Sequence, residues 1–279
     1  MTTEPQRVAT HARARQMLNK VPEVTIYFWV IKILATTVGE TAADFINTKL
    51  GLGLTGTSFV AAAVLIVVLF FQFRARKYVP GIYWLAVVLI SVVGTLITDN
   101  LVDNFGVALE TTTIVFGLAL AATFAAWYAC EKTLSIHTIH TTRREAFYWS
   151  AILFTFALGT AAGDLAAEQL NLGYLISALV FGALIAIVAA AHLGFKLNSV
   201  LAFWIAYILT RPLGASLGDY LSQPSDNGGL AVGTAGTSAL FLVTILSLVT
   251  YLTITRKDET PPQTTPETEH GQTAAPLPR

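Results

Sequence analysis

Charged residues are scarce in this chain: they make up 12% of its 279 residues, whereas hydrophobic residues make up 54%. A soluble globular domain usually has about 25% charged residues. The composition therefore excludes an ordinary soluble domain and predicts a protein that lies in a lipid bilayer. Cysteine is also nearly absent, because Cys130 is the single one. One thiol excludes a disulfide framework and any multi-cysteine zinc or iron–sulfur site, which need several thiolates.

Sequence motifs for catalysis and for cofactor binding are missing as well. The chain has no Gly-x-Ser-x-Gly turn, no Walker loop, no dinucleotide fingerprint and no HExxH motif. We therefore expect no enzyme activity, no cofactor and no nucleic-acid partner.

Eight apolar stretches are each long enough to cross a membrane as a helix, since about 20 helical residues span the hydrocarbon core. They lie at about residues 24–46, 54–73, 81–102, 107–130, 147–168, 173–195, 199–221 and 230–254. Residues 1–22 form a polar, basic N-terminal arm, and residues 256–279 are rich in Thr, Pro and acidic residues. Such a tail cannot bury enough apolar surface to offset its ordering entropy, so we expect it to be disordered. The predicted fold is all-α, with a polytopic membrane domain over residues 23–255.

Basic residues fall almost entirely on one side of these spans. Thirteen of the 17 lie in the N-terminal arm, in every second connection and after the last span, against Lys49 alone on the other side. Lys and Arg near membrane spans are retained in the cytoplasm. Both termini are thus predicted to be cytoplasmic, as an even number of spans requires.

The pattern Trp-x9-Gly-x4-Asp occurs four times in the chain. Its members are Trp29, Gly39 and Asp44; Trp84, Gly94 and Asp99; Trp149, Gly159 and Asp164; and Trp204, Gly214 and Asp219. An aromatic residue precedes each of these tryptophans. Each unit holds two spans, so the four motif helices cross the membrane in the same direction, as parallel repeats do. We predict four two-helix repeats, at about residues 23–77, 78–132, 143–196 and 197–255.

The motif tryptophans and aspartates lie about 22 Å apart along each helix, at 1.5 Å per residue. The tryptophans are therefore expected near the cytoplasmic membrane surface, either as an interfacial aromatic belt or packed against a neighbouring repeat. The glycines permit either close contact between helices or a local helix break that exposes backbone carbonyls.

Carboxylates are concentrated in the outer halves of the motif helices. Besides the four motif aspartates, Glu40, Asp103 and Glu168 lie one helical turn away on the same helix face. An acidic residue within a span is costly and usually faces a cavity, a partner or an ion path. Two interpretations stay open: a shared polar cavity, or carboxylates that are solvated at the helix ends or hydrogen-bonded between helices.

Two cations, Lys32 and Arg211, are predicted at membrane depth on motif helices, where the other repeats have uncharged residues. Each either forms a structural ion pair with a buried carboxylate or acts as a moving counter-charge or gate.

The segments KVPEVTIYFWVIKILATTVGETAADF (residues 20–45) and RREAFYWSAILFTFALGTAAGDLAAE (residues 143–168) resemble a family of uncharacterised bacterial integral membrane proteins. That family is built on a short repeat of unknown function that occurs four times. The resemblance covers about residues 20–255 and implies a multi-pass protein of the bacterial inner membrane. It implies no particular activity.

Together these features predict a secondary transporter that exchanges a divalent metal cation for protons through a central acidic cavity. Hard cations such as Mg²⁺ and Mn²⁺ prefer carboxylate and carbonyl oxygens as ligands. The four motif aspartates are the predicted metal ligands, the three further carboxylates serve entry or coupling, and Lys32 or Arg211 is an internal counter-charge. Two other functions stay open: a transporter or channel for a small polar organic solute, and a non-transporting membrane scaffold or partner subunit. Membrane lipids are the remaining predicted partners.

Overall fold

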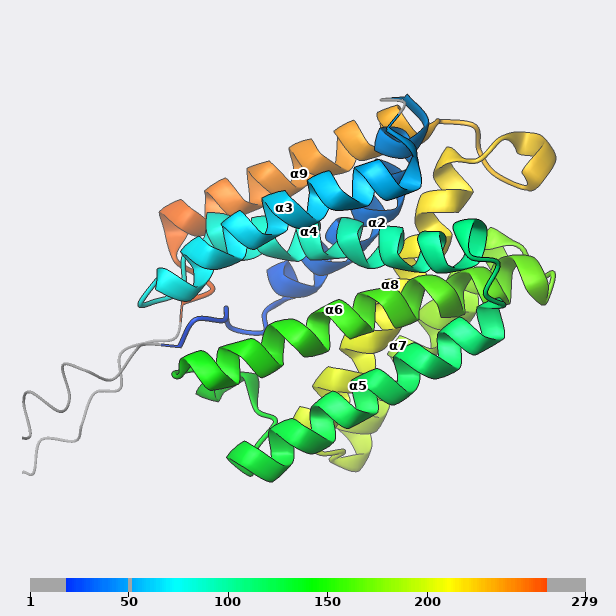
Figure 1. Cartoon of the computed structure of the whole chain (residues 1–279). Helices are drawn as coiled ribbons and strands as arrows, with labels where there is room; N and C mark the ends of the chain where they lie inside the picture. Colours follow the sequence, from blue (N-terminus) through cyan, green and yellow to red (C-terminus); the bar gives the residue numbers. More distant parts are fainter. Residues whose placement is uncertain (1–18, 50–51, 260–279) are drawn as a thin grey trace, which may run out of the picture.

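Eight long helices make up the part of the chain that the computed structural model describes, residues 19–49 and 52–259 (Figure 1). They are α2 (Ile26–Lys49), α3 (Gly53–Arg74), α4 (Pro80–Asp99), α5 (Leu109–Glu131), α6 (Thr142–Asp164), α7 (Tyr174–Phe195), α8 (Ser199–Ser222) and α9 (Thr234–Thr255). Each is long and apolar enough to cross a membrane, and no strand occurs in the described residues. The predicted all-α fold with eight spans is confirmed, and the chain is a multi-pass membrane protein.

The helix ends follow from local chemistry. Helix α6 begins at Thr142, five residues earlier than predicted, because the hydroxyl of Thr141 accepts a hydrogen bond from the Arg144 N–H and caps the first turn. A basic residue in the left-handed conformation ends each of α5, α7 and α9, namely Lys132, Lys196 and Arg256. A positive charge at this position complements the negative end of the helix dipole.

Two motif helices change their winding directly after the motif aspartate. The π-helix η1 (Asn100–Asn104) follows Asp99, and the π-helix η3 (Leu165–Gln169) follows Asp164. Helices α2 and α8 stay α-helical to their ends. Because π-turns are rare and occur often at functional sites, this end of the second and third repeats is a candidate functional region.

The motif helices α2, α4, α6 and α8 form a closed inner ring in which each helix packs on the next and α8 packs back on α2. The other four helices lie outside this ring. Each outer helix packs on the inner helix of the following repeat: α3 on α4, α5 on α6, α7 on α8 and α9 on α2. The four repeats are therefore arranged head to tail around one axis and interlocked by their outer helices.

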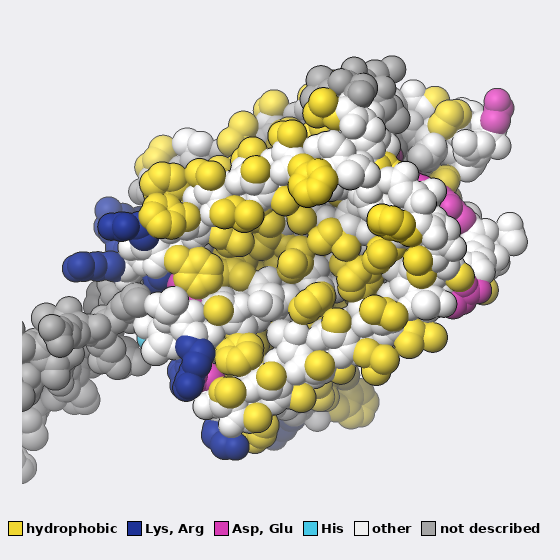
Figure 2. All heavy atoms as spheres, viewed as in Figure 1, with side chains coloured by type: hydrophobic (Ala, Val, Ile, Leu, Met, Phe, Trp, Pro, Cys, Tyr) yellow, Lys and Arg dark blue, Asp and Glu magenta, His cyan; other side chains and the backbone are white. Residues whose placement is uncertain are grey.

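Burial follows this division into inner and outer helices. In the apolar windows of the inner helices, 56% to 67% of residues are buried inside the protein, against 11% to 28% for the outer helices. The outer helices expose large apolar side chains such as Phe59, Leu179 and Leu246. Apolar side chains cover the face seen in Figure 2 between its two charged ends. A lipid environment accounts for this surface, because large exposed apolar areas are rare on soluble monomers.

Charge is separated between the two ends of the bundle (Figure 2). We call the end that carries the loop lysines and arginines the basic end; its described members are Arg74, Arg76, Lys77, Lys132, Arg143, Arg144, Lys196, Arg256 and Lys257. We call the opposite end, where the motif aspartates lie, the acidic end.

The borders of the two polar termini differ from the prediction. Lys20, assigned to the polar N-terminal arm, is buried: its Nζ lies 2.6 Å from Glu145 Oε2 and also donates to the backbone of α3. Asp258, assigned to the tail, is buried as well and accepts a hydrogen bond from the Tyr78 hydroxyl at 2.6 Å. Both partners are far away in the sequence, so composition alone could not reveal them. The other basic residues of the arm and the predicted disorder of residues 260–279 lie outside the described residues.

Candidate functional site

The motif tryptophans and the aromatic residues before them form a ring of side chains at the basic end of the inner helices. We call these eight residues the aromatic collar. Each aromatic residue contacts the motif tryptophan of the next inner helix, with ring centroids 5.6 Å apart for Phe28 and Trp84, 5.5 Å for Tyr83 and Trp149, 6.2 Å for Tyr148 and Trp204, and 5.8 Å for Phe203 and Trp29. The tryptophans thus pack between repeats, and the collar closes this end of the axis.

The motif glycines lie one level further along the axis, inside continuous helices. Each faces the residue three positions before the glycine of the next inner helix, in the pairs Gly39–Ser91, Gly94–Phe156, Gly159–Arg211 and Gly214–Thr36. A Cβ added to any of the four would overlap the facing side chain. The glycines therefore permit close helix contact around the ring, and none of them is a helix break.

The guanidinium of Arg211, fully buried, lies at the centre of the ring. Its Nη2 donates to Glu40 Oε2 at 2.8 Å, to Thr160 Oγ1 at 2.6 Å and to Thr95 Oγ1. Its Nη1 donates to the Thr36 carbonyl at 3.3 Å. The side chains of Glu40, Thr95 and Thr160 occupy the same repeat position on α2, α4 and α6, and the fourth repeat has alanine there. One arginine of the fourth repeat thus binds all three other repeats; we call this group the Arg211 cluster.

Lys32 lies between the collar and the Arg211 cluster, and its surroundings differ from those of Arg211. The side chain is fully buried, and its Nζ has no hydrogen-bond partner among the described residues. It lies 3.9 Å from the ring centroid of Phe156 and 4.2 Å from that of Tyr207. The ion-pair interpretation thus applies to Arg211, whereas Lys32 has cation–π contacts only.

A polar cavity of about 160 Å³ lies on the other side of the Arg211 cluster, toward the acidic end. All seven predicted carboxylates line it: Glu40, Asp44, Asp99, Asp103, Asp164, Glu168 and Asp219. They come from all four inner helices and from both π-helices. Asp103 and Glu168 are exposed, so the cavity reaches the surface at the acidic end. The structure thus brings these seven side chains together around one space.

Three of these carboxylates are closest to one another. Oxygens of Glu40, Asp164 and Asp219 all lie within 4.8 Å of each other, a spacing at which one cation can contact several carboxylates. The four predicted ligand aspartates are thus divided: Asp164 and Asp219 belong to this tight group together with Glu40, whereas Asp44 and Asp99 line the cavity outside it. The sequence treated the four repeats as equivalent, whereas only the first has a carboxylate at the Glu40 position.

Charge in the cavity is strongly unbalanced. Arg211 is the one cation that touches this group within the described chain, and it is engaged with Glu40. Two like charges 4 Å apart repel by about 4 kcal/mol at an effective dielectric constant of 20. Cations in the cavity, whether metal ions or protons, would lower this repulsion.

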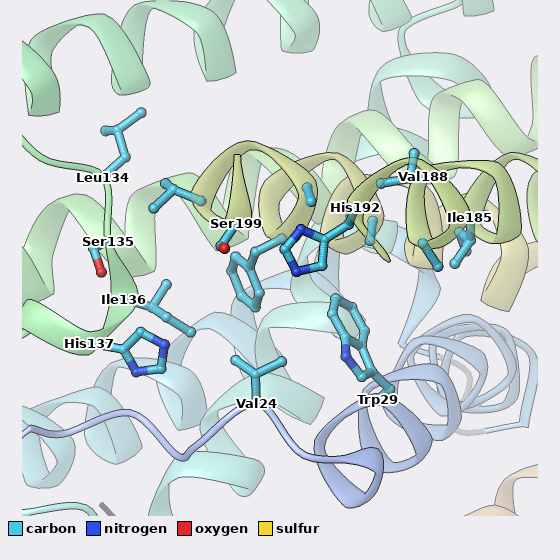
Figure 3. A pocket seen from close by; sticks show the side chains of 15 residues that line it. Val24, Trp29, Leu134, Ser135, Ile136, His137, Ile185, Val188, His192 and Ser199 are labelled. Atoms are coloured by element: carbon cyan, nitrogen blue, oxygen red, sulfur yellow. The ribbon is translucent and has the colours of Figure 1, made fainter. Parts of the chain in front are cut away.

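A second cavity, of about 480 Å³, lies at the basic end and was not predicted (Figure 3). Its walls come from α2, α7, α8 and the connection after α5 and are mostly apolar. Figure 3 shows Trp29, His137 and His192 among its lining residues. The ring of His192 is hydrogen-bonded through Nδ1 to the Leu197 carbonyl at 2.8 Å. This cavity lies beside the collar, outside the inner ring, and has no carboxylate in its wall.

The fold and the site define a class: a multi-pass α-helical membrane protein whose four parallel repeats enclose an axial polar cavity. The family follows from the sequence comparison, in which the model described as Repeat of Unknown Function (DUF347) matches residues 27–78, 82–133, 147–197 and 202–258. The chain belongs to this family, as the quoted segments predicted. No curated protein and no solved structure matches the chain.

Proposed function

We propose that this protein is a secondary transporter that exchanges a divalent metal cation for protons through the acidic cavity. One observation carries the proposal: seven carboxylates converge on a single cavity, and three of them have oxygens within 4.8 Å of one another. Carboxylate oxygens are the ligands that hard divalent cations prefer. Acidic residues in a membrane cavity also carry protons, so the same groups can exchange one cation for the other.

The proposal includes an orientation in the bacterial inner membrane. The excess of Lys and Arg at the basic end supports a cytoplasmic location for that end and for both termini. The acidic cavity then faces outward and is separated from the cytoplasm by the Arg211 cluster and the aromatic collar. Transport requires a second conformation in which the collar opens and the cavity closes.

The cavity favours a cation over a small polar organic solute. Its volume of about 160 Å³ is below the range of about 300–1,000 Å³ that is usual for organic ligands. An anionic solute would need a free cation, but Lys32 and Arg211 are both fully buried, and Arg211 is already bound to Glu40.

The proposal is tested by measuring Mn²⁺ flux in proteoliposomes. Asp164→Asn and Asp219→Asn each remove one charged ligand of the tight group with almost no change in size, and we expect each to abolish Mn²⁺ flux while the protein still folds. The matched control is Asp226→Asn, an exposed aspartate at the same end of the molecule and outside the cavity. Normal flux in both cavity variants would refute the ligand assignment, and no cation flux in the wild type would refute the function.

A further inference from the structure

Lys32 is a cation that the proposed cavity does not use. It lies on the axis, on the basic side of the Arg211 cluster, so it cannot contact a cation bound at the acidic end. Burying an ion without a counter-ion costs several kcal/mol, and unpaired ionisable residues inside membranes mark ion or proton paths. The two axial cations also differ chemically: arginine stays charged in proteins, whereas a buried lysine can release its proton.

Charged and titratable groups around Lys32 can be named helix by helix. From α8, Tyr207 lies against it and Arg211 lies one turn further along. From α6, its neighbour is the Phe156 ring, which does not titrate. The equivalent position on α4 is Val87, and on α2 itself the next titratable side chain toward the cavity is Glu40, two turns away. No carboxylate therefore faces Lys32 directly from these helices.

Several buried polar groups near Lys32 also lack a protein partner. The Tyr207 hydroxyl, the Ser91 hydroxyl and the Nε of Arg211 have none among the residues described. Buried polar groups are nearly always paired, and each exception calls for an explanation. In this protein the unpaired polar groups lie close to one another along the axis of the inner ring, from the Arg211 cluster toward the collar.

Tyrosine side chains of the inner helices lie between Lys32 and the basic end. Tyr83 and Tyr148 share a hydrogen bond of 2.5 Å between their hydroxyls, and the ring of Tyr78 packs against that of Tyr83 with centroids 5.5 Å apart. The Tyr78 hydroxyl donates to the buried carboxylate of Asp258, just after the end of α9. A hydroxyl both donates and accepts hydrogen bonds and so can pass a proton. The tightly packed rings of the collar, in contrast, leave a hydrated metal ion no way through in this conformation.

We propose that Lys32 is the proton-carrying residue of the transporter, loaded from the basic end through the hydroxyls of Tyr83, Tyr148 and Tyr207. Loading transfers one proton from water to the Lys32 amine and forms an ammonium ion; unloading breaks the same N–H bond and returns the proton. The added charge sits next to Arg211 and, through Coulomb repulsion, weakens cation binding at Glu40. This role rests on the proposed function, because it names the residue that couples the two ion movements.

The experiment separates cation movement from its coupling to protons. In proteoliposomes with equal Mn²⁺ on both sides and no pH gradient, tracer exchange reports cation movement alone. In a second assay, a pH gradient drives net Mn²⁺ accumulation, which needs coupling. For Lys32→Met we expect tracer exchange within about twofold of wild type and pH-driven accumulation reduced about 100-fold, the loss typical of removing a proton-transfer group. Lys32→Arg, permanently charged, is expected to lose accumulation in the same way.

Controls distinguish the possible failures. Lys257→Met, an exposed lysine at the basic end, is expected to retain both activities. Tyr83→Phe and Tyr148→Phe are expected to slow accumulation more than exchange. If Lys32→Met accumulated Mn²⁺ to the wild-type level, the proposed role of Lys32 would be overturned and the proposed function would stand. Loss of both activities in a folded Lys32→Met protein would make Lys32 structural, and no exchange by the wild type would overturn both proposals.

Discussion

Substitutions of the two axial cations, Arg211 and Lys32, are expected to have very different effects on stability. Methionine is unbranched and flexible enough to occupy either site without its charge. Arg211→Met removes the group that joins α8 to the other three inner helices. It leaves Glu40 buried without its counter-ion and the hydroxyls of Thr95 and Thr160 without their donor.

The magnitudes follow from these contacts. Removing one partner of a buried ion pair costs about 3–5 kcal/mol, because the remaining charge is uncompensated. We expect Arg211→Met to lower the free energy of unfolding by this amount. Lys32→Met removes two cation–π contacts worth about 2 kcal/mol each when desolvated, but it also removes a desolvation cost of several kcal/mol. These two contributions offset each other, so we expect Lys32→Met to change the free energy of unfolding by no more than about 1 kcal/mol.

The assay is equilibrium unfolding of purified protein in detergent or bicelles, followed by circular dichroism. The double variant Arg211→Met/Glu40→Gln completes a thermodynamic cycle, because it removes the carboxylate that the single variant leaves unpaired. We expect it to be more stable than Arg211→Met by at least about 1 kcal/mol. If Arg211→Met were no more destabilising than Lys32→Met, or if Glu40→Gln brought no recovery, the Arg211 cluster would not be what joins the inner helices.

Two further predictions concern packing and pH. Gly159→Ala forces a methyl group against Arg211 and is expected to destabilise the protein by about 1–3 kcal/mol. Gly81→Ala is the control, because its added methyl group meets open space. When unfolding is measured in the same way, we expect this control to be neutral or slightly stabilising. Burial raises the pKa of Asp258 above its ordinary value, so its protonated form is favoured in the folded protein and its contribution to stability is lost as the pH rises through that pKa. Asp258→Asn is expected to remove this component from the pH dependence of unfolding, and an unchanged pH profile would show that the buried Asp258 carboxyl does not cause it.

Local and periodic properties were readable from the sequence. Apolar runs of sufficient length predicted all eight spans, since a helix must satisfy its own backbone to cross lipid. The fourfold Trp, Gly and Asp pattern predicted the repeats. It also predicted the levels at which the collar, the glycines and the carboxylates lie, because parallel repeats place equivalent residues at equal depth. The shared cavity was one of two interpretations, and the convergence of the carboxylates became visible only in the folded chain.

Pairings between repeats depended on the tertiary structure. The sequence showed Lys32 and Arg211 as two similar symmetry-breaking charges, yet Arg211 pairs with a carboxylate on the neighbouring helix α2 and Lys32 has no such partner. It treated the motif aspartates as equivalent, whereas the tight group replaces two of them with Glu40. The ion pair of Lys20 with Glu145 joins residues 125 positions apart. Periodicity determines which face and which depth a residue occupies on its own helix. The distance to a residue on another helix depends on how the four repeats close into a ring, and only the folded chain contains that information.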